Sequence, residues 1–542
     1  MLLEPGADLI SINTIQHHII HGITLPFLSI PQRVVHQNTP LVVEHATTVR
    51  SRLMEYIDFG AVIRLPSDVD ISNESIQPLH VIIKPDKKPR IVIDLSRNLN
   101  QYLHYTYFSY SNIDTAVSLS SRECWYGKLD LSNCFLSFPL HPSVHRYFIF
   151  WFDGDYYQFV RMPFGLSTAP LVCTQLLSVI AYALTALNII HVRYLDDFLI
   201  IARDRATLHE QLFLAQTEIT KFGLVINNDK TEGPDQRITF LGIQLDSLSC
   251  SLSCPASRIA ELLALLRSLR HQHIITRHQL ESLIGKLSFA ALVLPGARPF
   301  LRRMLDTLNA CSSRRRRTTP VRLGKGFRLD VDFWLSHLLD WNGSQVWRSS
   351  RSSPFTFATD ASLTGFGFYL ESYPPSSFID PSLWPLSLQL GAGFSGSYAA
   401  AQAACHLSHK QIAWCELLAV LAAAITYGPY LKNQSVLFFV DNSTDVHIIN
   451  RQATKSKALA AILRQLFLVS LTYNLNIFAQ HRSGVSNTLA DFLSRPDLHH
   501  NDHVAVWHSA HPNDMSRLSS VSLVLSDSFI SWSPSSPFIP SV

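Results

Sequence analysis

The hydrophobic pattern predicts two α/β regions joined by a helical one. From Val49 to Asp246 short apolar strands alternate with two helices, at 167–187 and 204–222, whose apolar residues recur every three or four positions. Residues 255–310 are rich in Leu and helical in pattern. Residues 1–48 show no clear periodicity, and we expect an extended lead-in there.

A second α/β region is predicted to begin near Phe355, with a strand hairpin over FTFATDAS and LTGFGFYL. The elements expected after it are a helix at 411–427, a strand at 435–440, two helices, a strand at 476–480 and a helix at 486–495. Residues 371–410 are rich in Pro, Ser, Gly and Ala and indicate an insertion, in which we place no third strand. Beyond Pro496 the Ser- and Pro-heavy chain is expected to be disordered.

Composition indicates a folded protein with a local basic region. A chain of 542 residues with 47% hydrophobic and 16% charged residues is long enough for several globular domains. The formal net charge is only +4. Between Arg298 and Arg328, however, ten Lys and Arg face one acid, Asp306. This stretch is either a solvated linker or the border of a nucleic-acid channel, where it would neutralise phosphates.

Several function classes are disfavoured. The N-terminus lacks the basic start and apolar core of a signal peptide, and we expect the longest apolar runs, 179–190 and 417–426, to be too short to span a bilayer. We therefore expect an intracellular protein of the cytoplasm, the nucleus or both, with no membrane partner. Eight cysteines without a CxxC motif favour reduced structural thiols. A zinc site would need the poorly spaced set Cys250, Cys254, His271 and His273.

Two adjacent carboxylates interrupt an apolar stretch, HVRYLDDFLIIARD. Asp196 and Asp197 lie either at the tip of a β-hairpin or in a solvent-exposed turn. Asp130 follows another short strand, in WYGKLDLSNCF. Carboxylates on neighbouring strands can hold the two divalent ions that phosphoryl transfer requires. The pattern predicts Asp130 and Asp196 as bridging ligands, with Asp197 as a weaker one.

The order of the motifs resembles that of the reverse transcriptases of retroelements. PLHVIIKPDKKPRIVIDLSRNLN is similar to their fingers segment, KLDLSNCF and YLDD to their two catalytic motifs, and FVRMPFGLSTAP to their template-contacting motif. GLVINNDKTE resembles the segment in which this family carries a lysine proposed as general acid, and ITFLGIQLD resembles the primer grip. The resemblance implies RNA-directed DNA synthesis.

The resemblance also implies individual roles. The residues expected to bind the incoming nucleotide are Lys84, Arg90, Phe135 and Phe164. Phe135 would be a steric gate against the ribose 2′-hydroxyl, the group that distinguishes RNA from DNA; its alternative role is in the core. Lys230 would be the general acid for pyrophosphate, and Leu241 and Gly242 would form the primer grip.

Four further acids are expected to converge at one edge of the second sheet. They are Asp360, Glu416, Asp441 and Asp491. Singly each has a structural alternative, such as a helix cap for Asp441 or a surface acid for Asp491. Their order and the segment QHRSGVSNTLADFLSR resemble ribonuclease H, which implies a second two-metal site. His481 would be a mobile histidine that aids product release, or simply a surface histidine.

The fold expected from this resemblance is α/β with an α+β palm: a right-hand polymerase followed by a ribonuclease H-like domain. The predicted domains are a lead-in (1–48), fingers and palm (49–250), thumb and connection with the basic linker (251–350), a ribonuclease H-like domain (351–497) and a tail (498–542). The function expected is that of an RNA-directed DNA polymerase and ribonuclease H using Mg²⁺ or Mn²⁺, two ions per site.

The expected partners are an RNA template, a DNA primer, the RNA–DNA hybrid and deoxynucleoside triphosphates; the pattern does not indicate an oligomeric state. The motifs look most like DIRS-like, tyrosine-recombinase retrotransposons, with gypsy-type elements and pararetroviruses next. The lack of protease and integrase motifs favours the first weakly. The alternatives are a domesticated, non-catalytic RNA-binding scaffold and a decayed copy. All seven metal-binding acids are present, which argues against the scaffold.

Overall fold

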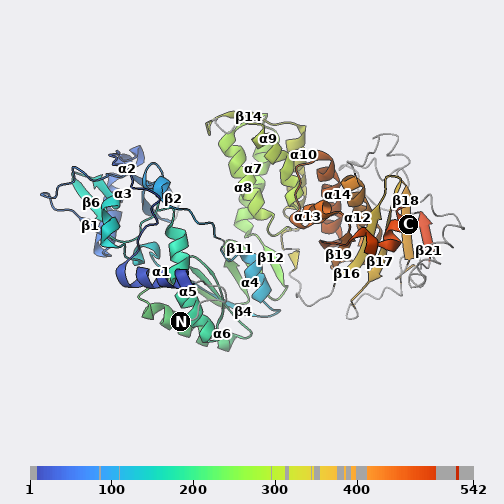
Figure 1. Cartoon of the computed structure of the whole chain (residues 1–542), viewed down its shortest axis with the longest axis horizontal. Helices are drawn as coiled ribbons and strands as arrows, with labels where there is room; N and C mark the ends of the chain where they lie inside the picture. Colours follow the sequence, from blue (N-terminus) through green and yellow to red (C-terminus); the bar gives the residue numbers. More distant parts are fainter. Residues whose placement is uncertain are drawn as a thin grey trace. The chain divides into compact units, whose positions relative to one another are not determined.

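The computed structural model divides into two compact units, coloured along the sequence in Figure 1. The residues it describes are 9–84, 87–108, 110–294, 296–311, 316–343, 345–346, 354–374, 384–385, 392–397, 412–495 and 520–523. The first unit is Met1–Leu241 with Leu245–Cys250, and the second is Gly242–Gln244 with Ser251–Val542. The finer division into fingers, palm, thumb and nuclease domains stays a prediction.

The first unit is an α+β assembly. Its helices are α1 (Leu9–His21), α2 (Pro40–Glu44), α3 (Ala46–Asp58), α4 (Ile113–Leu119), α5 (Ala169–Ala186) and α6 (Arg205–Lys221). Its strands are β1 (Val62–Arg64), β2 (Leu79–Lys84), β3 (Lys87–Ile93), β4 (Trp125–Asp130), β5 (Ile149–Phe152), β6 (Asp155–Phe159), β7 (Ile190–Tyr194), β8 (Asp197–Ala202), β9 (Glu232–Asp235) and β10 (Arg237–Phe240). They pair in the orders β1-β6-β5, β2-β3 and β7-β8-β4-β9.

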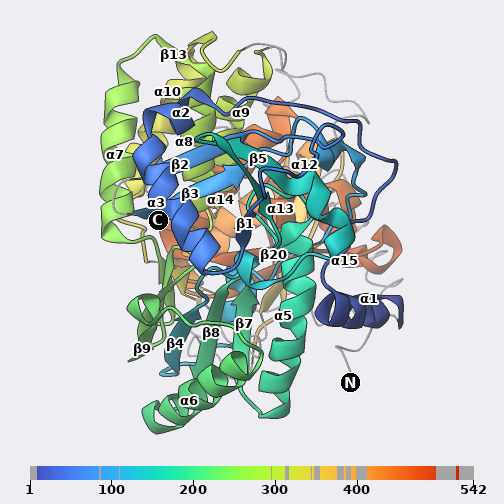
Figure 2. The ribbon, with the colours of Figure 1, turned by 90° about the vertical axis from the view of Figure 1, so that its left-hand side faces the viewer.

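The β7-β8-β4-β9 sheet is held in place by two amphipathic helices. Figure 2 shows α5 and α6 beside it, and both helices contact its strands. Helix α6 buries Leu208, Leu212, Ala215 and Ile219, the spacing that its sequence predicts. Asp204 caps its first turn by accepting from the Thr207 amide at 2.8 Å, and Gly223 follows with φ +75°.

The extended lead-in predicted for residues 1–48 is wrong where helices form, whereas 22–39 contains no helix and makes only isolated bridges. Leu9–His21 forms α1, and α2 and the start of α3 also lie in this range. The sequence of α1, LISINTIQHHIIH, spreads its apolar residues around much of the helix circumference. The regular alternation of an apolar and a polar face, which would have predicted the helix, is therefore missing. Helix α1 nevertheless buries Ile15, which joins the core of the first unit.

The second unit begins with helices and ends with a covered sheet. Its helices are α7 (Ala256–Arg270), α8 (Arg277–Ala290), α9 (Arg302–Asn309), α10 (Lys325–His337), α12 (Ile412–Tyr427), α13 (Ser443–Arg451), α14 (Lys457–Tyr473) and α15 (Thr488–Leu493). The strands of the large sheet are β16 (Phe355–Ala361), β17 (Gly365–Ser372), β18 (Ala392–Ser397), β19 (Ser435–Val440), β20 (Asn476–His481) and β21 (Ser520–Leu523). The shorter strands are β11 (Ile243–Asp246, at the unit boundary), β12 (Ser251–Ser253), β13 (Ile274–Thr276), β14 (Pro320–Arg322) and β15 (Gln345–Val346).

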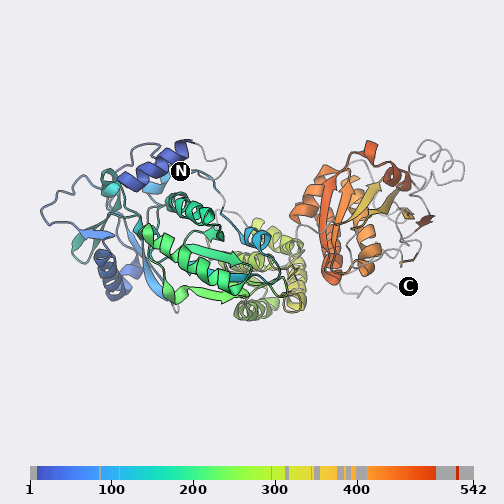
Figure 3. The same ribbon diagram turned by 90° about the horizontal axis from the view of Figure 1, so that it is seen from below.

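The large sheet has the order β20-β19-β16-β17-β18-β21 and helices on both faces (Figure 3). Successive residues of a strand point to opposite faces, and β16 shows this directly. Phe357 packs in the core with α12 and α14, whereas the adjacent Ala358 packs with Leu489 and Leu493 of α15. The sheet is therefore buried on both sides, and polar residues at its strand ends can be held rigidly.

Two expectations for this sheet need correction. The 371–410 insertion does contain a third strand: β18 pairs antiparallel with β17, although its sequence, AGFSGS, is too rich in small residues to show a strand pattern. The tail from 498 was expected to be disordered, yet Ser520–Leu523 forms β21, parallel to β18. The rest of the tail lies outside the described residues.

Two helices are long and apolar enough to cross a membrane by length and composition: Ala169–Ala186 and Ile412–Tyr430. The expectation that the apolar stretches are too short was therefore wrong, because polar residues inside a helix interrupt a run without ending the helix. Helix α12 buries residues around its whole circumference in the core of the second unit, and α5 packs in the core of the first. Burial in protein cores accounts for their composition.

Candidate active sites

The first carboxylate cluster lies where three strand ends meet. Asp130 ends β4 and is paired across the antiparallel ladder with Asp197, the first residue of β8. Asp196 lies in the two-residue turn between β7 and β8, with Leu195 at φ +51°. The Leu131 amide donates to the Asp196 carbonyl at 3.0 Å, which ties this turn to the strand carrying Asp130. The predicted hairpin with its acids at the tip is thus the observed arrangement.

The three carboxylates perturb one another electrostatically. Burial, then the charges of Asp196 and Asp130, raises the pKa of Asp197 to about 6. Burial is also the largest cause of the raised pKa of Asp196, to which Asp130 contributes. Carboxylates that hinder each other's ionisation are stabilised by a cation placed between them. The donor set is oxygen only, which suits a hard divalent ion.

Lys230 is close to this cluster. Its ammonium donates to Asp130 Oδ1 at 2.7 Å, and the Asn227 side-chain amide donates to the same oxygen at 3.3 Å. Lys230 itself is more than half exposed, while Asp130 is buried. The ion pair thus compensates one carboxylate of the cluster, and the role of Lys230 as a general acid stays a prediction.

Three of the four predicted nucleotide-binding residues form one stack. The Phe135 ring packs edge-on against Phe164 with a centroid separation of 5.5 Å. The Arg90 guanidinium lies 5.0 Å from the Phe164 centroid, and its charge acts on Asp196. Lys84 is the last residue of β2, and its side chain lies outside the described part of the chain. The stack therefore sits next to the carboxylates, with a cation at one end.

Gly165 is required by close packing in the FVRMPFGLSTAP segment. It has φ +110°, and a Cβ there would lie 2.0 Å from the Ile93 carbonyl oxygen. The Ile93 amide in turn donates to the Phe164 carbonyl at 3.2 Å. This contact between β3 and the segment fixes Phe164 and Arg90 on facing elements. No side chain larger than hydrogen fits.

The predicted primer grip, Leu241 and Gly242, is the two-residue turn between β10 and β11. Both residues have positive φ, +50° and +78°, which is the conformation of a type I′ hairpin turn. Leucine rarely adopts this conformation, so the turn holds Leu241 in a strained state. Backbone strain of this kind clusters at functional sites.

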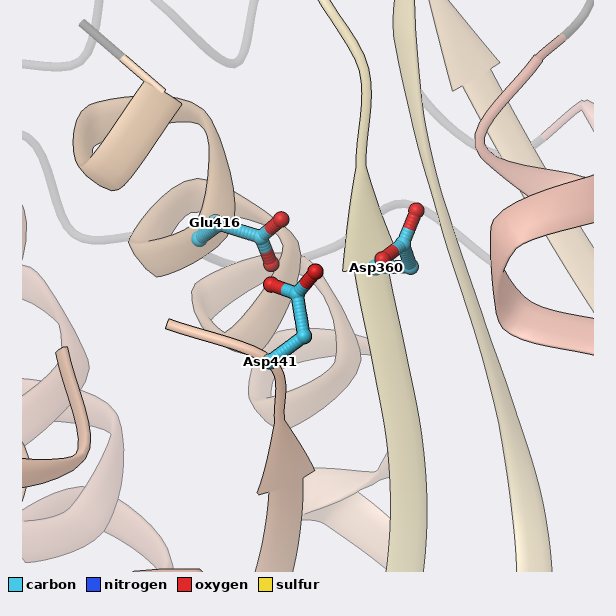
Figure 4. A group of neighbouring side chains, drawn as sticks. All are labelled: Asp360, Glu416 and Asp441. Atoms are coloured by element: carbon cyan, nitrogen blue, oxygen red, sulfur yellow. The ribbon is translucent and has the colours of Figure 1, made fainter. Parts of the chain in front are cut away.

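The second carboxylate cluster gathers acids from three elements of the second unit (Figure 4). Asp360 lies on β16, Glu416 on α12, and Asp441 directly follows β19, the parallel neighbour of β16. One carboxylate oxygen from each lies within 4.8 Å of the other two. The Ala361 amide donates to Glu416 Oε1 at 3.2 Å, whereas Glu416 Oε2 is buried without a hydrogen-bond partner in the described structure.

Burial makes Glu416 and Asp360 hard to ionise. It raises the pKa of Glu416 to about 11, with Asp360 and Asp441 as the next causes. It raises the pKa of Asp360 to about 7, and Asp441 and Asp491 add to this. Two buried carboxylates and the partly buried Asp441, with one Glu416 oxygen unpartnered in the described structure, fit a divalent cation, which would replace the missing positive charge.

Asp491 and His481 lie at the edge of this cluster. Asp491 acts electrostatically on Asp360, but its carboxylate is 43% exposed and accepts from Arg495 at 2.6 Å. His481 ends β20, beside Val440 in the parallel register, and is exposed. The geometry thus brings three of the four acids together, and the roles of Asp491 and His481 stay predictions.

Sequence reasoning missed one acid, Asp445. It lies in the first turn of α13 and is wholly buried. Neither of its carboxylate oxygens has a partner among the described residues. Burial, then the charge of Asp441, raises its pKa to about 8. Its position four residues after Asp441 was the available signal, but an acid in a first helical turn usually faces solvent and stabilises the helix dipole.

The cysteines do not form a metal site in the described part of the chain. Cys254 is buried and Cys250 is partly buried, and both are free thiols. His273 instead pairs with Arg328, with 2.9 Å between their nitrogens. Among the described residues, Asp360, Glu416 and Asp441 are the set of three potential ligands whose oxygens lie within 4.8 Å of one another. The oxygens of Asp130, Asp196 and Asp197 do not meet this distance, so these three would have to draw closer around an ion.

Comparisons with known proteins agree with the first cluster. Residues 78–245 match the family model described as reverse transcriptase (RNA-dependent DNA polymerase), a span that includes Asp130, Asp196 and Asp197. The chain therefore contains a reverse-transcriptase-type domain.

Longer similarities extend beyond this domain. The chain is 23% identical over 421 residues to an enzymatic polyprotein of Cassava vein mosaic virus, which covers 75% of this chain and 58% of that protein. It is 25% identical over 244 residues to the retrovirus-related Pol polyprotein from transposon 297 of Drosophila melanogaster, covering 44% and 22%. The chain thus spans less than two thirds of either relative. A solved structure of the foamy viral protease–reverse transcriptase with double-stranded DNA shares the fold, with a TM-score of 0.53, 14% identity and coverage of 85% and 74%.

Proposed function

We propose that the chain is an RNA-directed DNA polymerase with ribonuclease H activity, which copies a retroelement RNA into DNA and degrades the RNA of the resulting hybrid. The observation that carries the proposal is the pair of carboxylate clusters, one in each unit. In each cluster, burial and neighbouring carboxylates raise the pKa of at least one acid, as for Asp197 and Glu416. The family match over residues 78–245 supports the polymerase half.

In the polymerase site, Asp130, Asp196 and Asp197 would hold the metal ions. When bound, two divalent ions, Mg²⁺ or Mn²⁺, would activate the primer 3′-hydroxyl and neutralise the leaving pyrophosphate. Arg90, stacked on Phe164, is placed to neutralise the triphosphate of a deoxynucleotide. Phe135, which packs edge-on against Phe164, would exclude a 2′-hydroxyl, and Lys230 would donate a proton to pyrophosphate.

In the nuclease site, Asp360, Glu416 and Asp441 would hold the ions, with Asp491 at the open edge. The buried position of Glu416 fixes one side of the site, while the exposed carboxylate of Asp491 lies where substrate can reach it. His481, exposed at the end of β20, is suited to moving protons during product release. The expected substrate is the RNA strand of an RNA–DNA hybrid.

Among retroelements, DIRS-like elements remain the assignment that we favour, with gypsy-type elements next. The alternative of a non-catalytic scaffold is disfavoured because an unpaired buried carboxylate is costly and would be lost without a function. Glu416 is such a carboxylate, because it is buried and one of its oxygens has no partner in the described structure.

One substrate tests both activities. A DNA primer annealed to an end-labelled RNA template is incubated with deoxynucleotides and Mg²⁺ or Mn²⁺, and primer extension and RNA cleavage are followed together. We expect Asp196→Asn to lose extension by about 100-fold or more and to keep cleavage, and Glu416→Gln to do the reverse. Glu371→Gln, in the same sheet but away from the acids, should keep both. Cleavage by Glu416→Gln at the wild-type rate would contradict the nuclease assignment.

A further inference from the structure

A basic pocket of about 310 Å³ lies inside the second unit, apart from both carboxylate clusters. One wall comes from α9 and the start of α10, and the other from the first turns of α14. The walls are closely packed where they meet. The Gly296 amide donates to Gln452 Oε1 at 3.2 Å, and a Cβ on Gly296 would lie 2.6 Å from the Phe467 ring. The pocket is therefore a formed feature of this packing.

The pocket has an excess of positive charge. Its charged lining residues are Arg302, Arg303, Lys455, Lys457, Arg464 and Asp306. Asp306 pairs with Arg302, and the wholly buried Asp330 behind the wall accepts from Arg303 at 2.9 Å. After these two pairs, three cations remain without a carboxylate partner in the described structure.

Two details show that the cations of the pocket are incompletely satisfied. Arg302 Nε is buried and has no hydrogen-bond partner in the part of the chain that the structure describes. Burial, then the charge of Arg303, lowers the pKa of Arg464, and the charges of Asp330 and Asp306 offset this only in part. Cations that repel one another across a pocket are destabilising unless an anion joins them.

Two helix N-termini add to the positive potential of the pocket. Helix α10 begins after Gly324, which provides no side-chain cap, and no acid lies in its first turn. Gly324 and Gly326 both line the pocket. Helix α14 begins after Ser456, whose hydroxyl accepts from the Leu459 amide at 3.4 Å and so occupies one first-turn donor; Lys457 and Ala460 of its first turns also line the pocket. First-turn amides that lack intrahelical acceptors, together with the helix dipoles, favour a bound phosphate.

We propose that this pocket binds a backbone phosphate of a nucleic-acid strand. Arg464 has no ion-pair partner in the described structure and offers a fork-like donor for phosphate oxygens, while Lys455 and Lys457 are exposed at the rim, where a polymer can enter and leave. Helix α13, which follows Asp441, connects directly to α14 through residues 452–456. A phosphate held here would position a hybrid relative to the nuclease acids, so this role rests on the proposed function.

Binding of a labelled RNA–DNA hybrid to the full-length chain tests this. Fluorescence anisotropy in EDTA measures affinity without catalysis, over a series of salt concentrations. The Lys455→Gln/Lys457→Gln double variant and Arg464→Gln are compared with Lys432→Gln, which removes an exposed charge elsewhere in the unit. We expect about 5- to 10-fold weaker binding of the hybrid by both pocket variants and a salt dependence smaller by roughly 0.9 for one lost phosphate contact. Lys432→Gln should bind within about twofold of the wild type, and the lysine variants should melt like it, since Lys432, Lys455 and Lys457 are exposed. The melt of Arg464→Gln is recorded as well, because Arg464 is partly buried, and the lysine double variant keeps the test valid if Arg464→Gln is destabilised.

The outcomes separate the possible anions and the two proposals. Unchanged affinity and salt slope in both pocket variants would overturn the pocket assignment. If inorganic phosphate stabilises the wild type but not the variants against heat, while hybrid binding is unchanged, the site takes a free anion and the assignment is also wrong. If the variants bind normally and the wild type cleaves hybrid with Mg²⁺, the pocket proposal fails alone. A wild type that neither binds nor cleaves hybrid overturns the proposed function as well.

Discussion

Replacing Glu416 by glutamine should stabilise the metal-free protein while abolishing its nuclease activity. Burial holds the pKa of Glu416 at about 11 in the folded chain, against an ordinary value of 4.5. Between these values the folded chain retains a proton that the unfolded chain has released. Stability is therefore greatest below pH 4.5 and falls as pH rises, by about 1.4 kcal/mol per pH unit. At pH 7 this loss amounts to about 3 kcal/mol, and glutamine does not incur it.

Glutamine also keeps the local contacts. Its Oε1 can accept from the Ala361 amide as Glu416 does at 3.2 Å, and its amide nitrogen replaces the oxygen that has no partner in the described structure. Calorimetric melts in EDTA measure the effect. We expect the transition of the second unit to rise by roughly 6–12 °C at pH 7, and the difference to shrink to below about 1 kcal/mol at pH 5.

The matched control is Glu371→Gln. Glu371 accepts two hydrogen bonds from Arg482, both at 2.8 Å, and the Arg482 guanidinium lies 3.6 Å from the Phe439 ring centroid. The same substitution there removes a paired charge and should lower the melting temperature. If Glu416→Gln melts at or below the wild type at pH 7, or if its advantage does not grow with pH, the electrostatic description of the site is wrong.

Three further predictions follow from the same geometry. Phe135→Val should raise the incorporation of ribonucleotides relative to deoxynucleotides by about 10-fold or more, measured as a ratio of kcat/KM values; an unchanged ratio would assign Phe135 to the core. Gly165→Ala should cost roughly 2–4 kcal/mol in urea unfolding because its Cβ would lie 2.0 Å from the Ile93 carbonyl, while Gly60→Ala, with φ +72° but open space, should cost about 1 kcal/mol; equal costs would contradict the packing argument. Mn²⁺ affinity at the nuclease site should rise from pH 6 to pH 8, since burial raises the pKa of Asp360 to about 7 and the ion must displace that proton; calorimetric titration showing a pH-independent Kd would refute this.

Much of the polymerase site was predictable because its residues are local in sequence. The YLDD hairpin places Asp196 and Asp197 at one tip through turn chemistry alone, and a single strand pairing brings in Asp130. The ordered motifs then identify Arg90 and Phe164. Their stacking is a tertiary contact between β3 and a distant segment, and it could not be read from spacing.

In the nuclease site, three acids could be predicted from the sequence and a fourth, Asp445, could not. Asp360, Glu416 and Asp441 were recognisable because each interrupts or follows an apolar element. Asp445 was not, because its burial depends on how α13 packs and not on its neighbours in sequence. Strand β18 was missed for a related reason: its glycines and serines pair with β17 through the backbone, which needs no apolar alternation.

The first carboxylate cluster is proposed to catalyse DNA synthesis on an RNA template. The most direct measurement is extension of a DNA primer on an RNA template by the purified chain with Mg²⁺ or Mn²⁺, compared with Asp196→Asn. Lys432→Gln serves as a charge-changing control outside both carboxylate clusters. We expect the wild type and the control to extend the primer and Asp196→Asn to leave it unextended. Extension by Asp196→Asn at the wild-type rate, or no extension by the wild type with either ion, would contradict it.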